Sequence, residues 1–164
     1  MDRLEILGRV ASKVAPGRSL AYSEAHVLKA LQLIGSGESI GRQRLSNELG
    51  VGEGTMRTLI RRLKDEGLAR SSRRGLSLTG PGLEVLSHLS GLLAETALDG
   101  TSITVGSRDY AVLVRGASAF IRRGVEQRDA ALLSGAEGAT TLLFDGERVG
   151  MPGTELRLEE STAQ

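Results

Sequence analysis

The sequence has 164 residues, 40% of them hydrophobic, 25% charged and 2% aromatic, with a net charge of +1. These are globular proportions with room for two small domains, and so few rings disfavour modules that stack single-stranded bases. Cysteine is absent, which excludes disulfides, thiolate catalysis and cysteine-ligated metal sites, and two histidines make a zinc site hard to assemble. There is no signal-peptide pattern and no apolar run of the roughly 18 residues that a membrane helix needs, so we expect a cytoplasmic protein without membrane contact.

The charge is divided unevenly along the chain. Residues 1–80 hold 14 Lys and Arg against 8 Asp and Glu, whereas residues 81–164 hold 7 against 12. A basic first half and an acidic second half predict that only the first half meets a polyanion. Most of the basic residues are arginines, whose planar fork suits phosphates and guanine edges, although a GC-rich genome also raises arginine content.

Two helices are predicted before residue 40. The first spans residues 1–15, before Pro16, and its short apolar stripe is expected to pack on its own domain or on a second subunit. The stripe is Leu4, Leu7, Val10 (or Ala11) and Val14. The second has Ser23 as its N-cap and ends at Gly35, with His26 as a surface or hydrogen-bonded residue rather than a ligand.

A helix-turn-helix is predicted next. Residues 42–49 form a helix that Gly50 ends in a left-handed conformation, and residues 55–66 form the following helix. The glycines between them match no phosphate-loop pattern, and a tight turn that approaches DNA closely is the simpler interpretation.

The helix over residues 55–66 has an apolar side and an arginine side. Met56, Leu59, Ile60 and Leu63 lie on one side, so Arg57 and Arg61 face outward, as in a recognition helix that enters the major groove. The alternative is a surface helix that carries basic residues only for solubility. The candidate DNA-binding residues are Arg42, Arg44, Glu53, Thr55, Arg57, Thr58, Arg61, Arg62, Lys64, Arg73 and Arg74, with Arg62 and Lys64 on phosphates.

A basic β-hairpin, or wing, follows over residues 70–76. It is predicted from two short alternating segments, 68–70 and 76–78, and such wings place arginine on phosphates or in a narrow minor groove. A fourth helix then starts at Thr79 or Gly80, with an inner face of Leu83, Leu86 (or Val85) and Leu89. Its Glu84 and His88 have metal-like spacing but no third ligand, and we expect a surface pair.

The second half predicts a smaller α+β domain. Residues 90–100 are interpreted as the boundary, 102–105 and 110–115 as strands, and 120–134 as a loop that leads into a helix. An Asp145-Gly146 turn joins strands 140–144 and 147–151. The expected fold class is therefore α+β, with a winged helix-turn-helix domain over 1–92 and a small α+β domain over 101–158.

Polar residues around the predicted helix of the second domain are candidates for a small ligand with a carboxylate or phosphate. They are Arg115, Arg122, Arg123, Glu126, Arg128 and Asp129. A solvated helix with ion pairs is the alternative. No catalytic residue, metal or cofactor is predicted, because no nucleophile motif or paired-carboxylate pattern stands out.

Three stretches resemble an archaeal winged-helix family whose C-terminal domain has unknown function: IGRQRLSNELGVGEGTMRTLIRRLKDEGL, SRRGLSLT and RGVEQRDAALLSGAEGATTLLFDGERVGMPG. The resemblance implies a transcriptional regulator. The sequence thus predicts a sequence-specific regulator that binds double-stranded DNA, as a homodimer, with a small-molecule effector as a candidate partner. The alternatives are a metabolite-acting enzyme with a fused autoregulatory winged helix, and a winged helix that serves as a protein-binding scaffold.

Overall fold

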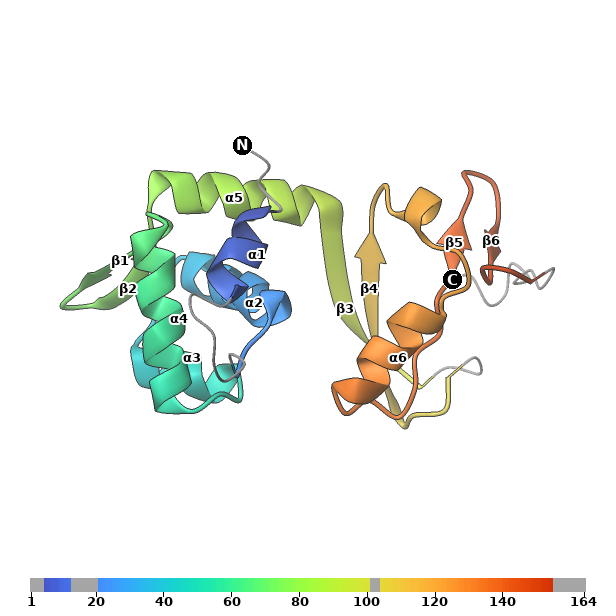
Figure 1. Cartoon of the computed structure of the whole chain (residues 1–164), viewed down its shortest axis with the longest axis horizontal. Helices are drawn as coiled ribbons and strands as arrows, with labels where there is room; N and C mark the ends of the chain where they lie inside the picture. The colour runs from blue at the N-terminus through green and yellow to red at the C-terminus, as the bar shows by residue number, and fades with distance from the viewer. Residues whose placement is uncertain (1–4, 13–20, 101–103, 155–164) are drawn as a thin grey trace. The chain divides into compact units, whose positions relative to one another are not determined.

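The chain consists of two compact units, Met1–Ser90 and Gly91–Gln164 (Figure 1). A computed structural model describes residues 5–12, 21–100 and 104–154. The first unit contains α1 (Glu5–Ala11), α2 (Glu24–Gly35), α3 (Arg42–Glu48), α4 (Glu53–Asp65), β1 (Ala69–Ser72), β2 (Gly75–Leu78) and α5 (Gly80–Leu92), whose last two residues already belong to the second unit. The second contains β3 (Leu93–Asp99), β4 (Arg108–Val114), a short 3-10 helix (Ser118–Phe120), α6 (Val125–Leu133), β5 (Leu143–Phe144) and β6 (Val149–Gly150). The predicted α+β fold class is confirmed.

The first unit has one hydrophobic core. Its largest fully buried side chains come from the helices α1 to α5 and from the residue that precedes β1. They are Val10, Val27, Leu31, Leu45, Met56, Leu59, Leu63, Leu68 and Leu89. α1 packs on α2 and α4, so this helix docks on its own domain, which was one of the two expected outcomes. Leu4 and Val14, which the sequence pattern assigns to the same helix, lie outside the described residues.

The start of α2 follows its predicted N-cap. Ser23 is extended, and its backbone N–H donates to Nδ1 of His26 at 3.1 Å. The Ser23 hydroxyl lies 3.0 Å from the same ring nitrogen. His26 therefore closes a capping box, a role that its type did not suggest, because Glu or Gln usually fills that position.

Two predicted helices differ in detail. α4 begins at Glu53 instead of Thr55, because Gly52 is the N-cap and Gly54 already belongs to the first helical turn. The prediction of the inner face of α5 is also wrong in part. Leu83 is 53% exposed, while Val85 and Leu89 are buried. α5 is placed by Gly82, where an added Cβ would lie 2.0 Å from the carbonyl oxygen of Leu68.

The wing is a two-stranded antiparallel hairpin whose loop is Arg73-Arg74. Ser72 pairs with Gly75, and Gly75 has a φ of +125°, a conformation that side chains disfavour. An added Cβ at Gly75 would also lie 2.7 Å from the carbonyl oxygen of Ile40. Ile40 joins the sheet through a single bridge to Leu76, with N–H···O distances of 3.2 and 2.9 Å. A sequence pattern does not predict this bridge, because a single paired residue has no alternation.

The first hairpin of the second unit corrects the predicted boundary. Residues 93–99 form β3, which pairs antiparallel with β4 from Leu93 opposite Val114 to Asp99 opposite Arg108. The strand expected at 102–105 is not found at residues 104 and 105, and 101–103 lie outside the described residues. The sequence pattern did not predict β3, because the adjacent polar residues Glu95 and Thr96 interrupt the alternation of apolar and polar residues and are typical of a linker.

The second hairpin, β5–β6, forms around the predicted Asp145-Gly146 turn with shorter strands than expected. The carboxylate of Asp145 accepts the N–H groups of Glu147 and Arg148 at 2.9 and 2.8 Å. These hydrogen bonds, that of Arg148 first, hold the pKa of the Asp145 carboxyl below its ordinary value. The Asp145 side chain thus accepts hydrogen bonds from backbone N–H groups of the turn, in place of a backbone carbonyl.

The described part of the second unit has almost no buried core. Only Gly124 and Pro152 are buried there, and they lie against each other at the start of α6. Gly124 has a φ of +74°, and an added Cβ would lie 2.8 Å from Cβ of Thr141. The hydrophobic side chains of this unit are mostly open on its surface.

A buried arginine joins α4 to the end of α1. Arg62 is 9% exposed, and its Nη1 donates to the carbonyl oxygens of Val10, at 2.8 Å, and of Ser12. Tyr22 donates its hydroxyl to the same Val10 oxygen at 3.0 Å. Nearby, Arg9 and Glu66 form an ion pair at 3.0 Å. A guanidinium at the C-terminal carbonyls of α1 satisfies acceptors that the helix cannot.

Replacing Arg62 is expected to destabilise the first unit. Arg62→Ala leaves the Val10 and Ser12 carbonyls with fewer donors and opens a space under α1, so the free energy of unfolding falls by about 2–4 kcal/mol. Chemical denaturation followed by circular dichroism measures the loss. Arg61→Ala, the exposed neighbour on the same helix, is the matched control and changes stability by less than about 0.5 kcal/mol. Equal effects of the two variants would show that the Arg62 contacts carry no stability.

Candidate nucleic-acid interface

The interface is built on the side of α4 that the core leaves free. Met56, Leu59 and Leu63 are buried at 1% exposure or less, which fixes the rotation of the helix. Arg57 and Arg61 lie on the opposite side and are exposed. The two arginines are one helical turn apart and so project together from the unit.

The N-terminal end of α4 is open at the backbone. An added Cβ at Gly52 or Gly54 would meet no atom within 4 Å among the described residues. Glu53 is exposed and Thr55 half-buried at this end. The Thr58 hydroxyl donates to the Gly54 carbonyl at 3.2 Å, which holds that side chain along the helix.

The turn before α4 is fixed by a residue that the sequence pattern did not single out. The Ser46 hydroxyl donates to the Val51 carbonyl at 2.6 Å, and the Val51 N–H donates back to the Ser46 carbonyl at 3.2 Å. Gly50, with a φ of +62°, adopts the predicted left-handed conformation between them. This reciprocal pair sets the direction in which α4 leaves α3.

The other candidate residues surround this face. Arg42 and Arg44 are exposed on α3. Arg44 lies 3.9 Å from Glu48, but an ion pair this exposed to solvent restrains the Arg44 side chain only weakly. Lys64 is exposed on α4. Arg73 and Arg74 are exposed and make up the tip of the wing.

Arg70 was missed among the candidates. It is exposed on β1, and its Nε donates to the Ser77 hydroxyl across the hairpin at 3.2 Å. The alternation of β1 carries the signal, because the solvent side of a wing strand is where a phosphate contact is made.

Arg62 does not belong to the face. The predicted phosphate contact is wrong for this residue, because its guanidinium is buried against α1 and already bonded to two carbonyl groups. Helical angles place Arg62 on the flank of α4 but do not say which neighbour lies there. Burial raises the pKa of the nearby Tyr22 phenol, although the charge of Arg62 opposes this.

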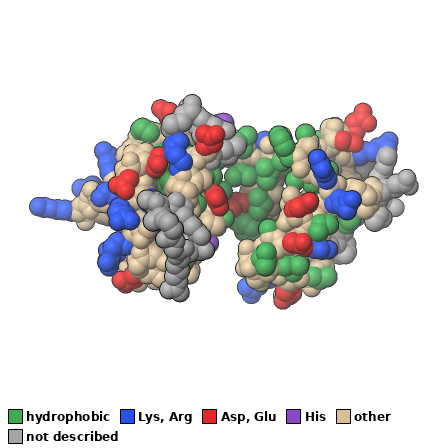
Figure 2. Space-filling model, viewed as in Figure 1, with side chains coloured by type: hydrophobic (Ala, Val, Ile, Leu, Met, Phe, Trp, Pro, Cys, Tyr) green, Lys and Arg blue, Asp and Glu red, His purple; other side chains and the backbone are tan. Residues whose placement is uncertain are grey.

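Lys and Arg side chains gather on the edge of the first unit that carries the wing and α4 (Figure 2). The exposed arginines of these two elements define the candidate interface: Arg57 and Arg61 on α4, and Arg70, Arg73 and Arg74 on the wing. A helix end with an open backbone, flanked by a basic hairpin, has the dimensions and charge to meet a duplex groove and its phosphates.

The six predicted ligand residues of the second unit do not form one cluster. Arg115 follows β4, where its Nη1 donates to the Gly91 carbonyl at 3.2 Å. Arg122, Arg123 and Glu126 are exposed around the start of α6. Arg128 and Asp129, which are neighbours in sequence, form an ion pair at 2.9 Å.

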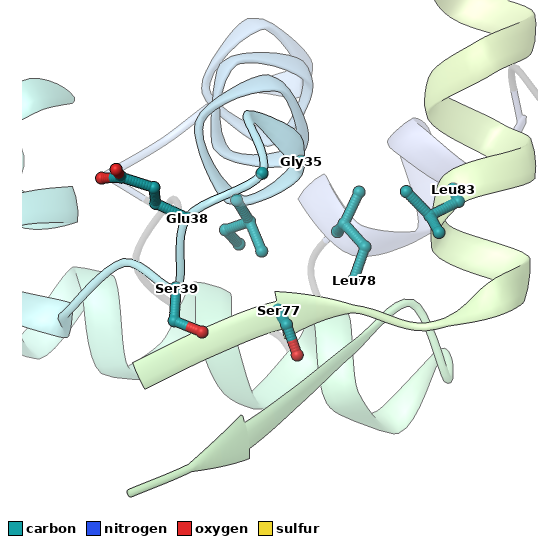
Figure 3. Close-up of a pocket in the computed structure, with 8 residues that line it drawn as sticks. Gly35, Glu38, Ser39, Ser77, Leu78 and Leu83 are labelled. Carbon is teal, nitrogen blue, oxygen red and sulfur yellow. The ribbon is translucent and has the colours of Figure 1, made fainter. Parts of the chain in front are cut away.

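A shallow hollow of about 160 Å³ lies in the first unit, between the end of α2 and the β2–α5 corner (Figure 3). Leu78 and Leu83 point toward each other across it, while the carboxylate of Glu38 points away. Ser39 and Ser77 complete the polar part of its wall. It has no cluster of charged groups and none of the predicted site residues.

In the ranges 5–12, 21–100 and 104–154, no group of three or more His, Cys, Asp or Glu is placed to hold a metal ion. Glu84 and His88 are both exposed on α5. None of the helices described there combines the length and the hydropathy needed to cross a membrane.

Two protein-family models match different parts of the chain. Residues 25–93 match the CggR N-terminal DNA binding domain, and residues 105–164 match a domain of unknown function, DUF4443. No curated protein matches the chain. The first match covers all of the proposed interface.

Solved structures are also similar to the chain. The hypothetical protein PH0730 from Pyrococcus horikoshii OT3 is 26% identical with a TM-score of 0.66, over 87% of this chain and 72% of its own. The hypothetical protein SSo2273 from Sulfolobus solfataricus is 21% identical, with a TM-score of 0.36 over 40% of this chain and 52% of its own. The Mycobacterium tuberculosis MarR family protein Rv2887, solved with p-aminosalicylic acid, is 18% identical, with a TM-score of 0.37 over 54% of this chain and 71% of its own.

The family matches agree with the geometry of the first unit and leave the second without an assigned activity. Together the two matches support a DNA-binding regulator that joins an N-terminal winged-helix domain to a domain of unknown function.

Proposed function

We propose that this protein is a sequence-specific transcription regulator that binds duplex DNA through α4 and the wing. Arg57 and Arg61 reach base edges in the major groove, and Arg73 and Arg74 bind phosphates or enter the minor groove. The protein acts in the cytoplasm and binds DNA as a homodimer, so that two copies read two half-sites.

One observation carries this proposal. The side of α4 opposite its buried apolar face is arginine-rich, and the backbone at its N-terminal end is open. A surface helix that needed only solubility would not also have glycines at the positions that approach a groove. The match to a DNA-binding domain over residues 25–93 supports the same interpretation.

The wing is expected to supply salt-dependent, sequence-independent affinity. Arg73→Ala removes one phosphate contact, so binding to every duplex weakens and the slope of log K against log salt becomes shallower by about 0.9. Fluorescence anisotropy with labelled duplexes at several salt concentrations measures both. Arg148→Ala, an exposed arginine of the acidic unit, is the control and leaves the slope unchanged. Binding that is insensitive to salt in the unmodified protein would contradict the proposal.

α4 is expected to supply sequence preference. Arg61→Ala should reduce the discrimination between the preferred operator and a duplex altered at the contacted base by ~1–3 kcal/mol, while non-specific binding falls much less. The operator is first found by genome-wide mapping of bound DNA, and competition binding then compares the two duplexes. If Arg61→Ala lowers affinity for both duplexes equally, Arg61 contacts the backbone and not a base.

Sensing of a small metabolite by the second unit stays a prediction. Its six residues are spread over the end of β4, the loop before α6 and α6 itself, and a ligand would have to bring them together. The alternative function, a metabolite-acting enzyme with a regulatory winged helix, has no supporting geometry among the described residues. The regulator-type domain favours binding over turnover.

A thermal-shift screen with small carboxylates and phosphorylated metabolites tests the sensor. A compound at 100 times its dissociation constant stabilises the folded state by ~2.7 kcal/mol, which raises the melting temperature by several degrees. Arg128→Ala should abolish the shift, while Arg148→Ala should keep it. A shift that persists in Arg128→Ala would place the ligand elsewhere, and consumption of the compound would identify an enzyme.

A further inference from the structure

The second unit exposes hydrophobic side chains that a folded unit of its size normally buries. Among the described residues, every exposed large hydrophobic side chain except Leu83 belongs to this unit. Figure 2 shows hydrophobic side chains open on the face in view. Four of these residues lie close together on β4, with exposures of 57% for Tyr110, 57% for Val112, 53% for Leu113 and 49% for Val114. Apolar surface concentrated in this way marks an interaction site.

β4 also has an unpaired edge. The β3–β4 sheet has two strands, and in the described residues no strand pairs with the outer edge of β4. The Arg115 N–H donates to the Leu92 carbonyl at 2.8 Å, so the backbone N–H of Arg115 points toward the β3 side of the hairpin. Because N–H groups alternate along an antiparallel strand, those of Tyr110, Val112 and Val114 point outward. A two-stranded hairpin is at best marginally stable without a further partner.

The two edges of this hairpin differ in their chemistry. β3 carries Glu95 and Asp99 along its length, and charges discourage a second strand from adding there. β4 also has two charged residues, Arg108 and Asp109, but both lie at its first end, and the rest of the strand is an apolar run from Tyr110 to Val114 without proline or charge. Of the two edges, β4 is the one suited to pair with another strand.

We infer that β4 pairs with β4 of a second copy, antiparallel and centred on Ala111, to form a continuous four-stranded sheet. This register sets Tyr110 opposite Val112 of the partner subunit, an aromatic and β-branched pair that stabilises sheets. It also sets Arg108 opposite Val114 of the partner subunit. No like charges on β4 face each other, and the outward N–H and C=O groups of both strands are used.

The sequence of β4 favours a second copy of this chain as the partner of its outer edge. Pairing about a two-fold axis needs a surface that is complementary to itself, and the register about Ala111 matches each outward residue of β4 with another outward residue. This inference rests on the proposed function, because a regulator that reads two half-sites requires two copies. It adds the surface that joins them.

Sedimentation equilibrium of the full chain tests the pairing. The unmodified protein should have the mass of two chains, and Val112→Pro should have that of one at the same concentration. Proline at this position removes an outward N–H and leaves the bonds to β3 in place. Leu133→Lys, which replaces the 90% exposed side chain of α6, is the control and should remain dimeric. A monomeric unmodified protein, or a Val112→Pro variant that stays fully dimeric, would overturn the inference.

Cross-linking gives a second test that does not depend on how proline is tolerated. The chain has no cysteine, so Ala111→Cys introduces a single thiol at the proposed two-fold axis. Non-hydrogen-bonded positions in antiparallel strands have Cα atoms ~4.5 Å apart, within the range of a disulfide. Mild oxidation should link Ala111→Cys chains into dimers at least tenfold faster than Leu133→Cys chains. Equal rates would exclude the register centred on Ala111.

The outcomes separate this inference from the proposed function. If the β4 variants are monomeric and Arg61→Ala leaves DNA recognition unchanged, the pairing stands and the role of α4 fails. If Arg61→Ala loses sequence preference while Val112→Pro remains dimeric and Ala111→Cys does not cross-link, DNA recognition stands and the β4 pairing is wrong.

Discussion

The burial of one side of α4 is the constraint on which the proposed interface depends. Met56, Leu59 and Leu63 enter the core of the first unit, and their burial decides which way the rest of the helix points. Hydrophobic burial has no direction of its own, but on a helix with a 3.6-residue period it fixes one rotation. The arginines then face solvent because no other side remains for them.

Arg62 supports that constraint from the flank. It is charged and yet buried, and its cost of desolvation is offset by bonds to carbonyls at the end of α1, where the helix dipole is negative. α4 is thereby held from two directions, by its apolar side and by α1. A helix positioned in this way reaches a groove in a defined orientation, which base recognition requires more than charge alone.

The two units differ in how they are stabilised. The first has a full hydrophobic core, whereas the described part of the second buries only Gly124 and Pro152 and consists of two hairpins, a 3-10 helix and one short α-helix. A unit with so little buried surface gains stability by adding surface from elsewhere. Pairing through β4 supplies that surface, and it would make stability of the second unit depend on protein concentration.

The sequence by itself determined the elements of the first unit, because their signals are local. Helical periodicity, the Ser23 cap, the left-handed Gly50 and the basic wing all act within a few residues of each other. The outward side of α4 followed from the same periodicity. The Asp145 turn of the second unit was predictable for the same reason, since its side chain bonds to the next two N–H groups.

Only the tertiary structure decided where α1 packs, what Arg62 contacts and which segment pairs with β4. Each depends on residues far apart in the chain, such as Val10 with Arg62 or Ile40 with Leu76. β3 reads as a linker because its polar residues are tolerated on an exposed strand, and pairing with β4 alone reveals it. Contacts between distant segments leave no period in the sequence, so local patterns cannot specify them.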